Sequence, residues 1–95
     1  MIIKFEFGDD YIQYISCSSK VGRKIYKTQN DFFDWISDDE KNKEYWAYEN
    51  GEKDCLNYDA HAIADWLNNV KFKKGIAKAK VVKNPKRKPK KTLYY

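Results

Sequence analysis

Cysteine and histidine are the residue types best suited to nucleophilic or metal chemistry, and this chain has few of them. His61 is the only histidine, and Cys55 precedes it by six residues. A Cys–His dyad needs an activated thiolate and a third group that orients the pair, and the sequence marks neither. Cys17, Cys55 and His61 also lack the short-spaced ligand pair of a metal site. We therefore expect no catalytic residues, no metal and no cofactor, and a protein that is not an enzyme.

Charged side chains are segregated along the chain. All fourteen Asp and Glu residues lie at or before Asp65, whereas residues 71–95 carry ten Lys and Arg87, a formal charge of +11. Residues 1–70 carry eight basic and fourteen acidic residues, a charge of −6, so the net +5 combines two parts of opposite sign. A basic segment of this kind indicates contact with a polyanion, with DNA or RNA first. The alternative interpretation is a solvated tail that has no binding role.

The basic segment after Val82 ends in aromatic residues. Residues 83–91 hold two prolines, six basic residues and no apolar side chain, which predicts an extended tail that is disordered when free. Tyr94 and Tyr95 then offer rings that could stack on bases or dock in a protein pocket. The predicted polyanion contacts are Lys78, Lys80, Lys83, Lys86, Arg87, Lys88, Lys90, Lys91, Tyr94 and Tyr95.

Acidic residues crowd the middle of the chain and suggest a second surface. Such a face could mimic phosphates and occupy a nucleic-acid channel in another protein. The alternatives are an ordinary solvated face, or a face onto which the basic tail folds back. The candidate acidic residues for a protein partner are Asp34, Asp38, Asp39, Glu40 and Glu44.

The first half of the chain must position these residues on strands followed by a helix. Ile2–Phe7 alternates apolar and charged residues, and Tyr11–Cys17 is rich in β-branched and aromatic residues, so the two predict a hairpin. Arg23–Lys27 is expected to add a short third strand. Thr28 is expected to cap the helix that carries Phe32 and its apolar neighbours.

The second half repeats strands and a helix. Asn50-Gly51 between aromatic-rich segments predicts a type I′ turn, with Tyr48 opposite Lys53, Trp46 opposite Cys55 and Glu49 opposite Glu52. Asp59 is expected to cap a helix from Ala60 to about Val70, with Ile63, Trp66, Leu67 and Val70 on one stripe. Ile76–Val82 alternates small apolar residues with lysines and predicts a last strand with a basic outer face.

Together these elements predict an α+β fold, ordered β-β-(β)-α-β-β-α-β, in a small single domain. Two helices are expected on one face of a mostly antiparallel sheet. We expect residues 1–82 to form the compact domain and to fold without residues 83–95, the basic C-terminal tail. The expected core residues are Phe5, Phe7, Trp35, Trp46, Trp66 and Leu67.

The sequence supports two main function hypotheses. The first is a non-enzymatic nucleic-acid-associated module that contacts DNA, RNA or a ribonucleoprotein through its basic segment. The second is an inhibitor of the counter-defence, anti-CRISPR-like kind, whose acidic face blocks a nucleic-acid-handling enzyme of the host. The size, the Lys, Tyr and Asn content and the compact plan resemble small proteins of bacterial viruses and mobile elements in general. A small hydrolase is a distant third.

Location and partners are predicted from what the composition excludes. The N-terminal segment has a strand pattern and not that of a signal peptide, and no apolar run is long enough to span a bilayer. Two cysteines are too few for a disulfide framework, which leaves either one bridge or two reduced thiols. We expect a cytoplasmic protein, in the host cell if it is viral, with no membrane and no small-molecule substrate.

Overall fold

A computed structural model describes the chain at residues 1–8, 10–38 and 40–95, and at residues 53–55 it describes the backbone alone. The described part contains a four-stranded sheet in the order β5-β2-β1-β6. β1 pairs antiparallel with β2 and parallel with β6, and β2 pairs antiparallel with β5. The strands are β1 (Ile2–Glu6), β2 (Ile12–Ser16), β5 (Lys80–Val82) and β6 (Lys91–Tyr94). The α+β class and the mostly antiparallel sheet are confirmed.

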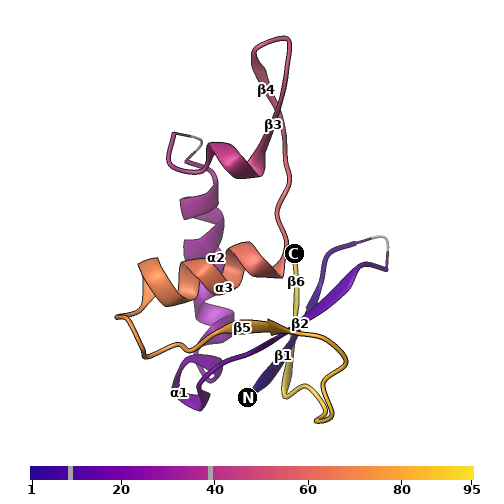
Figure 1. Cartoon of the computed structure of the whole chain (residues 1–95), viewed down its shortest axis with the longest axis vertical. Coiled ribbons are helices and arrows are strands. Elements are labelled where there is room, and N and C mark those ends of the chain that lie inside the picture. Colours follow the sequence, from indigo (N-terminus) through magenta and orange to yellow (C-terminus); the bar gives the residue numbers. More distant parts are fainter. Residues whose placement is uncertain (9, 39) are drawn as a thin grey trace.

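One face of this sheet is apolar because alternate residues of each strand point to it. Ile3 pairs with Ile15, Phe5 pairs with Leu93, and all four side chains are at most 1% exposed. Helices α2 (Ile25–Ile36) and α3 (Ala60–Trp66) contribute about half of the core and cover this face (Figure 1). The two-helix layer is therefore as predicted, and within the described part of the chain neither helix covers the opposite face of the sheet.

Two predictions about the start of α2 are wrong. Its buried residues recur every three or four positions and are Ile25, Thr28, Phe32 and Ile36. That spacing continues the helical stripe back to Ile25, so the predicted strand Arg23–Lys27 is wrong. Thr28 is not the N-cap either, because its hydroxyl donates to the Ile25 carbonyl at 2.7 Å inside the helix. Tertiary burial of Ile25 extends a helix whose local sequence favours a later start.

A short helix precedes α2, and a π-helical turn follows α3. Helix α1 (Ser19–Gly22) is capped by Ser18, whose hydroxyl oxygen accepts from Val21 N. Asp59 caps α3 as predicted, since its Oδ1 accepts from His61 N at 2.9 Å. After Trp66 the chain continues as η2 (Leu67–Lys71). This wider turn ends the predicted stripe early, and Val70 is 54% exposed.

The Asn-Gly hairpin forms as predicted, with one change of register. A 3-10 turn, η1 (Lys43–Tyr45), leads into β3 (Trp46–Glu49), which pairs with β4 (Glu52–Leu56) and extends away from the main sheet (Figure 1). Asn50 and Gly51 have φ of 54° and 79°, the left-handed values that a type I′ turn needs. Tyr48 pairs with Lys53 and Glu49 with Glu52 as predicted, but a bulge places Ala47 and not Trp46 opposite Cys55.

The C-terminal residues belong to the sheet, which corrects the predicted boundary at Val82. The last strand of the sheet, β6, pairs in parallel with β1, and its Leu93 is 1% exposed. The predicted last strand Ile76–Val82 is shorter, because β5 spans Lys80–Val82. The prediction treats the basic, Pro-containing segment as a tail, and it therefore assigns all later residues to the tail as well. Residues 83–90 instead link two edge strands.

The predicted core is half right. Phe5, Trp66 and Leu67 are at most 2% exposed. The predicted residues that are only partly buried are Phe7, Trp35 and Trp46. The Trp46 indole donates to the Ile36 carbonyl at 3.0 Å, which ties the projecting hairpin to the end of α2. A fully buried ring sits at the centre instead, in Phe32 of α2, whose centroid lies 5.5 Å from that of Trp66.

Candidate nucleic-acid interface

The basic linker, residues 83–90, crosses the uncovered face of the sheet. It joins β5 to β6, which form opposite edges of the sheet, so it must pass the two middle strands. Lys90 N donates to the Ile2 carbonyl at 2.9 Å, which fixes the far end of the linker at the start of β1. Pro85 and Pro89 are partly buried, whereas every Lys and Arg of the linker is exposed. The prolines thus pack toward the protein and the cations face solvent.

A second basic segment lies at the same end of the molecule. Lys20 belongs to α1, and Arg23 and Lys24 follow it directly. Lys91 Nζ donates to the Arg23 carbonyl at 2.9 Å and lies 5.1 Å from the centre of the Tyr26 ring. These contacts hold the start of β6 against the turn between α1 and α2, although 68 residues separate the two along the chain.

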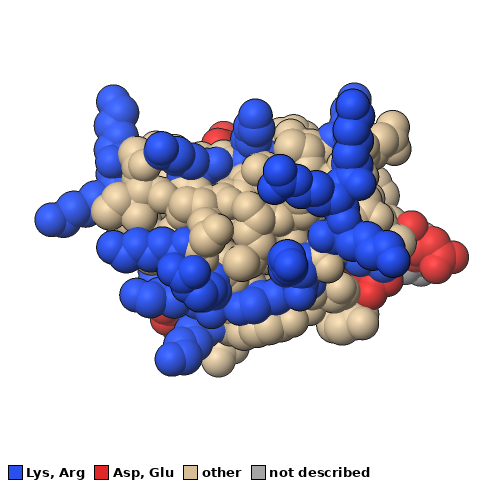
Figure 2. All heavy atoms as spheres, turned by 90° about the horizontal axis from the view of Figure 1, so that it is seen from below, with Lys and Arg blue, Asp and Glu red and all other residues tan. Residues whose placement is uncertain are grey.

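Lys and Arg side chains consequently gather over the end of the molecule from which α2 starts, and few acidic side chains are visible among them (Figure 2). Sequence analysis missed the contribution of Lys20, Arg23 and Lys24. The signal was present, because residues 11–30 contain four basic residues and no Asp or Glu. It was hidden by the stronger excess of basic residues after Val70.

Lys91 differs in burial from the other predicted basic contacts. Lys91 is partly buried and makes the contacts given above, so its charge is shared with the fold. The predicted basic residues that are exposed are Lys78, Lys80, Lys83, Lys86, Arg87, Lys88 and Lys90. They come from the loop before β5, from β5 itself and from the basic linker.

The two predicted aromatic anchors differ sharply in their surroundings. The Tyr95 ring packs among core rings, with its centroid 5.1 Å from that of Phe5 and 5.9 Å from that of Phe32. Burial raises the pKa of the Tyr95 phenol well above its usual value, and the nearby Tyr58 adds to the shift. Tyr95 is thus held within the fold, and its role as an anchor on a partner stays a prediction. Its neighbour Tyr94 is 70% exposed.

The predicted acidic face lies at the other end of α2. Asp34 is exposed on α2, Asp38 is partly exposed just after it, and Lys41 Nζ is 3.8 Å from Asp38 Oδ2. Glu40 and Glu44 are exposed between α2 and the hairpin. Asp39 lies outside the described residues. In Figure 1 this region, the acidic end of α2, lies in the upper half of the molecule below the β3–β4 hairpin, whereas the basic linker lies at the lower end.

His61 and Asp59 form a polar cluster at the start of α3. His61 Nδ1 lies 3.3 Å from Asp59 Oδ2, and Gln13 Oε1 accepts from Ala60 N at 2.7 Å. Partial burial alone would raise the pKa of the Asp59 carboxyl, but hydrogen bonds and charge attraction from His61 outweigh it and lower that pKa. The cluster is fully explained by capping of the helix.

The cysteine chemistry considered from the sequence receives no support at Cys17. It is a free, buried thiol, and burial raises its pKa, which disfavours the thiolate that a nucleophile needs. The side chain of Cys55 lies outside the described residues. Among described residues, no group of three or more His, Cys, Asp or Glu side chains is placed to hold a metal ion. No helix in that part of the chain is both long and apolar enough to cross a membrane.

Comparisons of this chain with protein-family models, with curated proteins and with solved structures found no match. The function must therefore be argued from the surface of this molecule.

Proposed function

We propose that this protein is a non-enzymatic nucleic-acid-binding module whose basic end contacts the phosphates of DNA or RNA. One observation carries the proposal: the basic linker and the turn between α1 and α2, which are far apart in the sequence, bring cations to the same end of the fold. Cations that neutralise phosphates release condensed counterions, which favours binding at low and moderate salt. A nucleic acid within a ribonucleoprotein offers the same chemistry.

The opposite charge at the far end supports the same proposal. Asp34, Glu40 and Glu44 are exposed in the last turn of α2 or beyond it, and the basic linker lies near the start of this helix. A polyanion attracts one end and repels the other, so the charge separation orients the protein during encounter. We place this activity in the cytoplasm, because a free buried thiol such as Cys17 is typical of a reducing compartment.

A salt series on the whole protein tests the proposal. Binding of a labelled nucleic acid is measured between about 50 and 200 mM salt, and each phosphate contact adds about 0.7–0.9 to the slope of log K against log salt. The double variant Lys86→Gln/Lys88→Gln should weaken binding and lower the slope by between about one and two. The control Lys41→Gln/Lys43→Gln removes the same charge at the acidic end and should change neither. A binding affinity that does not change with salt concentration would overturn the proposal.

A second function is favoured by the exposure of the acidic end. The basic linker does not fold onto Asp34, Glu40 or Glu44, so these carboxylates remain open to a partner. We propose as the alternative that this end blocks the basic channel of a nucleic-acid-handling host enzyme, as a viral inhibitor would. Pull-down from a bacterial lysate with and without nuclease separates the two. Capture of such an enzyme after nuclease treatment, with loss of its activity, would favour the inhibitor.

A further inference from the structure

Tyr14 occupies the centre of the uncovered sheet face. It lies on β2, one of the two middle strands, and its neighbour Ile15 points into the core. Lys4 of β1 is opposite Tyr14 on one side, and Val82 of β5 is opposite it on the other. The aromatic ring therefore lies on the face that the two helices leave open, next to β5, the strand that precedes the basic linker.

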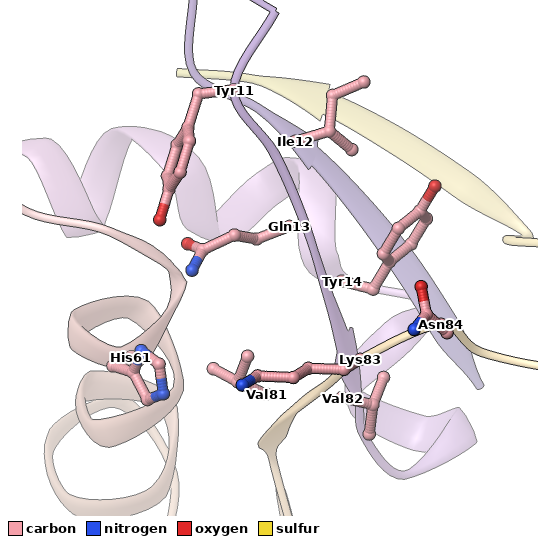
Figure 3. Close-up of a pocket in the computed structure, with 9 residues that line it drawn as sticks. All are labelled: Tyr11, Ile12, Gln13, Tyr14, His61, Val81, Val82, Lys83 and Asn84. Atoms are coloured by element: carbon pink, nitrogen blue, oxygen red, sulfur yellow. The ribbon is translucent and has the colours of Figure 1, made fainter.

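Two hollows meet at Tyr14 and Asn84, which line both of them. The first, of about 320 Å³, extends toward His61 and is drawn in Figure 3. The second, of about 410 Å³, follows the basic linker as far as Pro89. In Figure 3, Tyr14 and Asn84 lie side by side on this face, and the side chain of Lys83 reaches toward His61. The two hollows adjoin at Tyr14 and Asn84, and together they are called the groove below.

Tyr14 is partly buried, and the charge around this groove distinguishes it from the exposed Tyr94. Of the described side chains that line the two hollows, none is Asp or Glu, while Lys83, Lys86, Arg87 and Lys88 are all present. Tyr94 is more exposed, but Glu6 and Asp10 line the hollow beside it. Carboxylates repel phosphates at short range, so Tyr94 is poorly placed to receive a nucleic acid.

An aromatic ring beside a run of cations favours one form of nucleic acid over the other. Bases of a duplex are stacked on one another, and they offer a side chain only their edges in the grooves. Bases of a single strand can turn outward and stack on an aromatic side chain while the backbone follows a basic groove. A groove that combines both features suits the single strand.

We propose that this groove binds a single-stranded segment of DNA or RNA, with a base stacked on Tyr14 and its phosphates along Lys83, Lys86, Arg87 and Lys88. This inference rests on the proposed nucleic-acid-binding function and narrows it. The prolines of the linker are partly buried, so its backbone is held along the groove and only the exposed cationic side chains are ordered on binding.

The first measurement compares the two forms of nucleic acid on the whole protein. Fluorescence anisotropy at about 100 mM salt is recorded with labelled oligo-dT or oligo-U, and with a duplex that carries the same number of phosphates. Tighter binding of the single strands is expected. Equal or tighter binding of the duplex would overturn this inference and leave the proposed function standing. Absence of binding to either would overturn both.

The second measurement changes the ring and leaves the charge. Tyr14→Leu should weaken single-strand binding roughly 5- to 150-fold, the range that loss of stacking with one base produces. Its salt slope should stay that of the wild type, because no cation is removed. Tyr14→Phe keeps the ring and should bind like the wild type. The matched control is Tyr48→Leu, which removes a tyrosine that is 46% exposed on the distant hairpin and should leave binding unchanged.

The third measurement needs no variant, so it tests stacking on Tyr14 even if Tyr14→Leu fails to fold. Oligo-U that contains 5-iodouridine forms photochemical crosslinks to aromatic residues on which its bases stack. After crosslinking to the wild-type protein, digestion and mass spectrometry should identify Tyr14 as the main attachment site. Crosslinks at Tyr94 or Tyr26 in place of Tyr14 would overturn the assignment of the groove.

Discussion

Leu93 of β6 lies opposite Phe5 of β1 in parallel register, and both side chains are buried. Strand β6 thus completes the edge of the sheet and closes the aromatic cluster with Tyr95. The basic linker is in consequence anchored at both ends. A segment that the sequence presents as a free tail is a loop whose backbone is anchored at both ends, and its exposed cations extend from that loop.

Leu93→Ala should destabilise the protein by about 2–5 kcal/mol, the usual cost of deleting a buried leucine side chain. Thermal or urea unfolding followed by circular dichroism measures the change. Tyr94→Ala, at the exposed neighbouring position, is the control and should change stability by less than about 0.5 kcal/mol. If both variants unfold like the wild type, β6 does not belong to the cooperative unit.

Gly51→Val should destabilise the hairpin by roughly 1–3 kcal/mol, because Gly51 has φ of 79° and a β-branched residue resists that conformation. No atom lies within 4 Å of the position that a Cβ would take, so the effect is one of backbone strain and not of collision. Amide hydrogen exchange should show faster opening in β3 and β4 than in β1 and β2. Unchanged exchange in the hairpin would contradict this account.

Sequence analysis succeeded where a local pattern and the tertiary structure agree. The alternation in Ile2–Phe7, the Asn50-Gly51 turn and the Asp59 cap each depend on nearby residues alone. It failed where long-range burial decided the outcome. Ile25 extends α2 because it enters the core, and Leu93 forms a strand because β1 offers an unpaired edge.

The candidate site was predicted only in part for the same reason. The linker cations could be read directly from the sequence, because an excess of Lys is visible without a fold. The roles of the tyrosines could not be read from the sequence. Tyr14, Tyr94 and Tyr95 are the same residue type and differ only in what surrounds them. Tyr95 packs in the core, Tyr94 lies by carboxylates, and Tyr14 lies among cations.

Alkaline pH should destabilise the protein partly through Tyr95. Burial raises the pKa of its phenol in the folded state above the usual value of about 10, so the neutral form is favoured by folding. This contribution is fully present below about pH 10 and is lost as pH rises toward the folded-state pKa. Unfolding midpoints between about pH 8 and 11.5 measure the effect. Tyr95→Phe keeps the packed ring and should lose less stability over this range than the wild type does.

Neutralising the acidic end should leave nucleic-acid binding unchanged at moderate salt. At about 0.1 M ionic strength the Debye length is about 10 Å, and at about 0.01 M it is about 30 Å. The acidic end of α2 and the basic linker lie well apart along the long axis of the molecule, so the carboxylates act on a polyanion bound at the linker chiefly when salt is low. The double variant Asp34→Asn/Glu40→Gln should match the wild-type Kd at about 0.1 M salt and bind slightly more tightly at about 0.01 M. A large change of Kd at the higher salt would mean that the acidic end itself contacts the partner, as the inhibitor alternative requires.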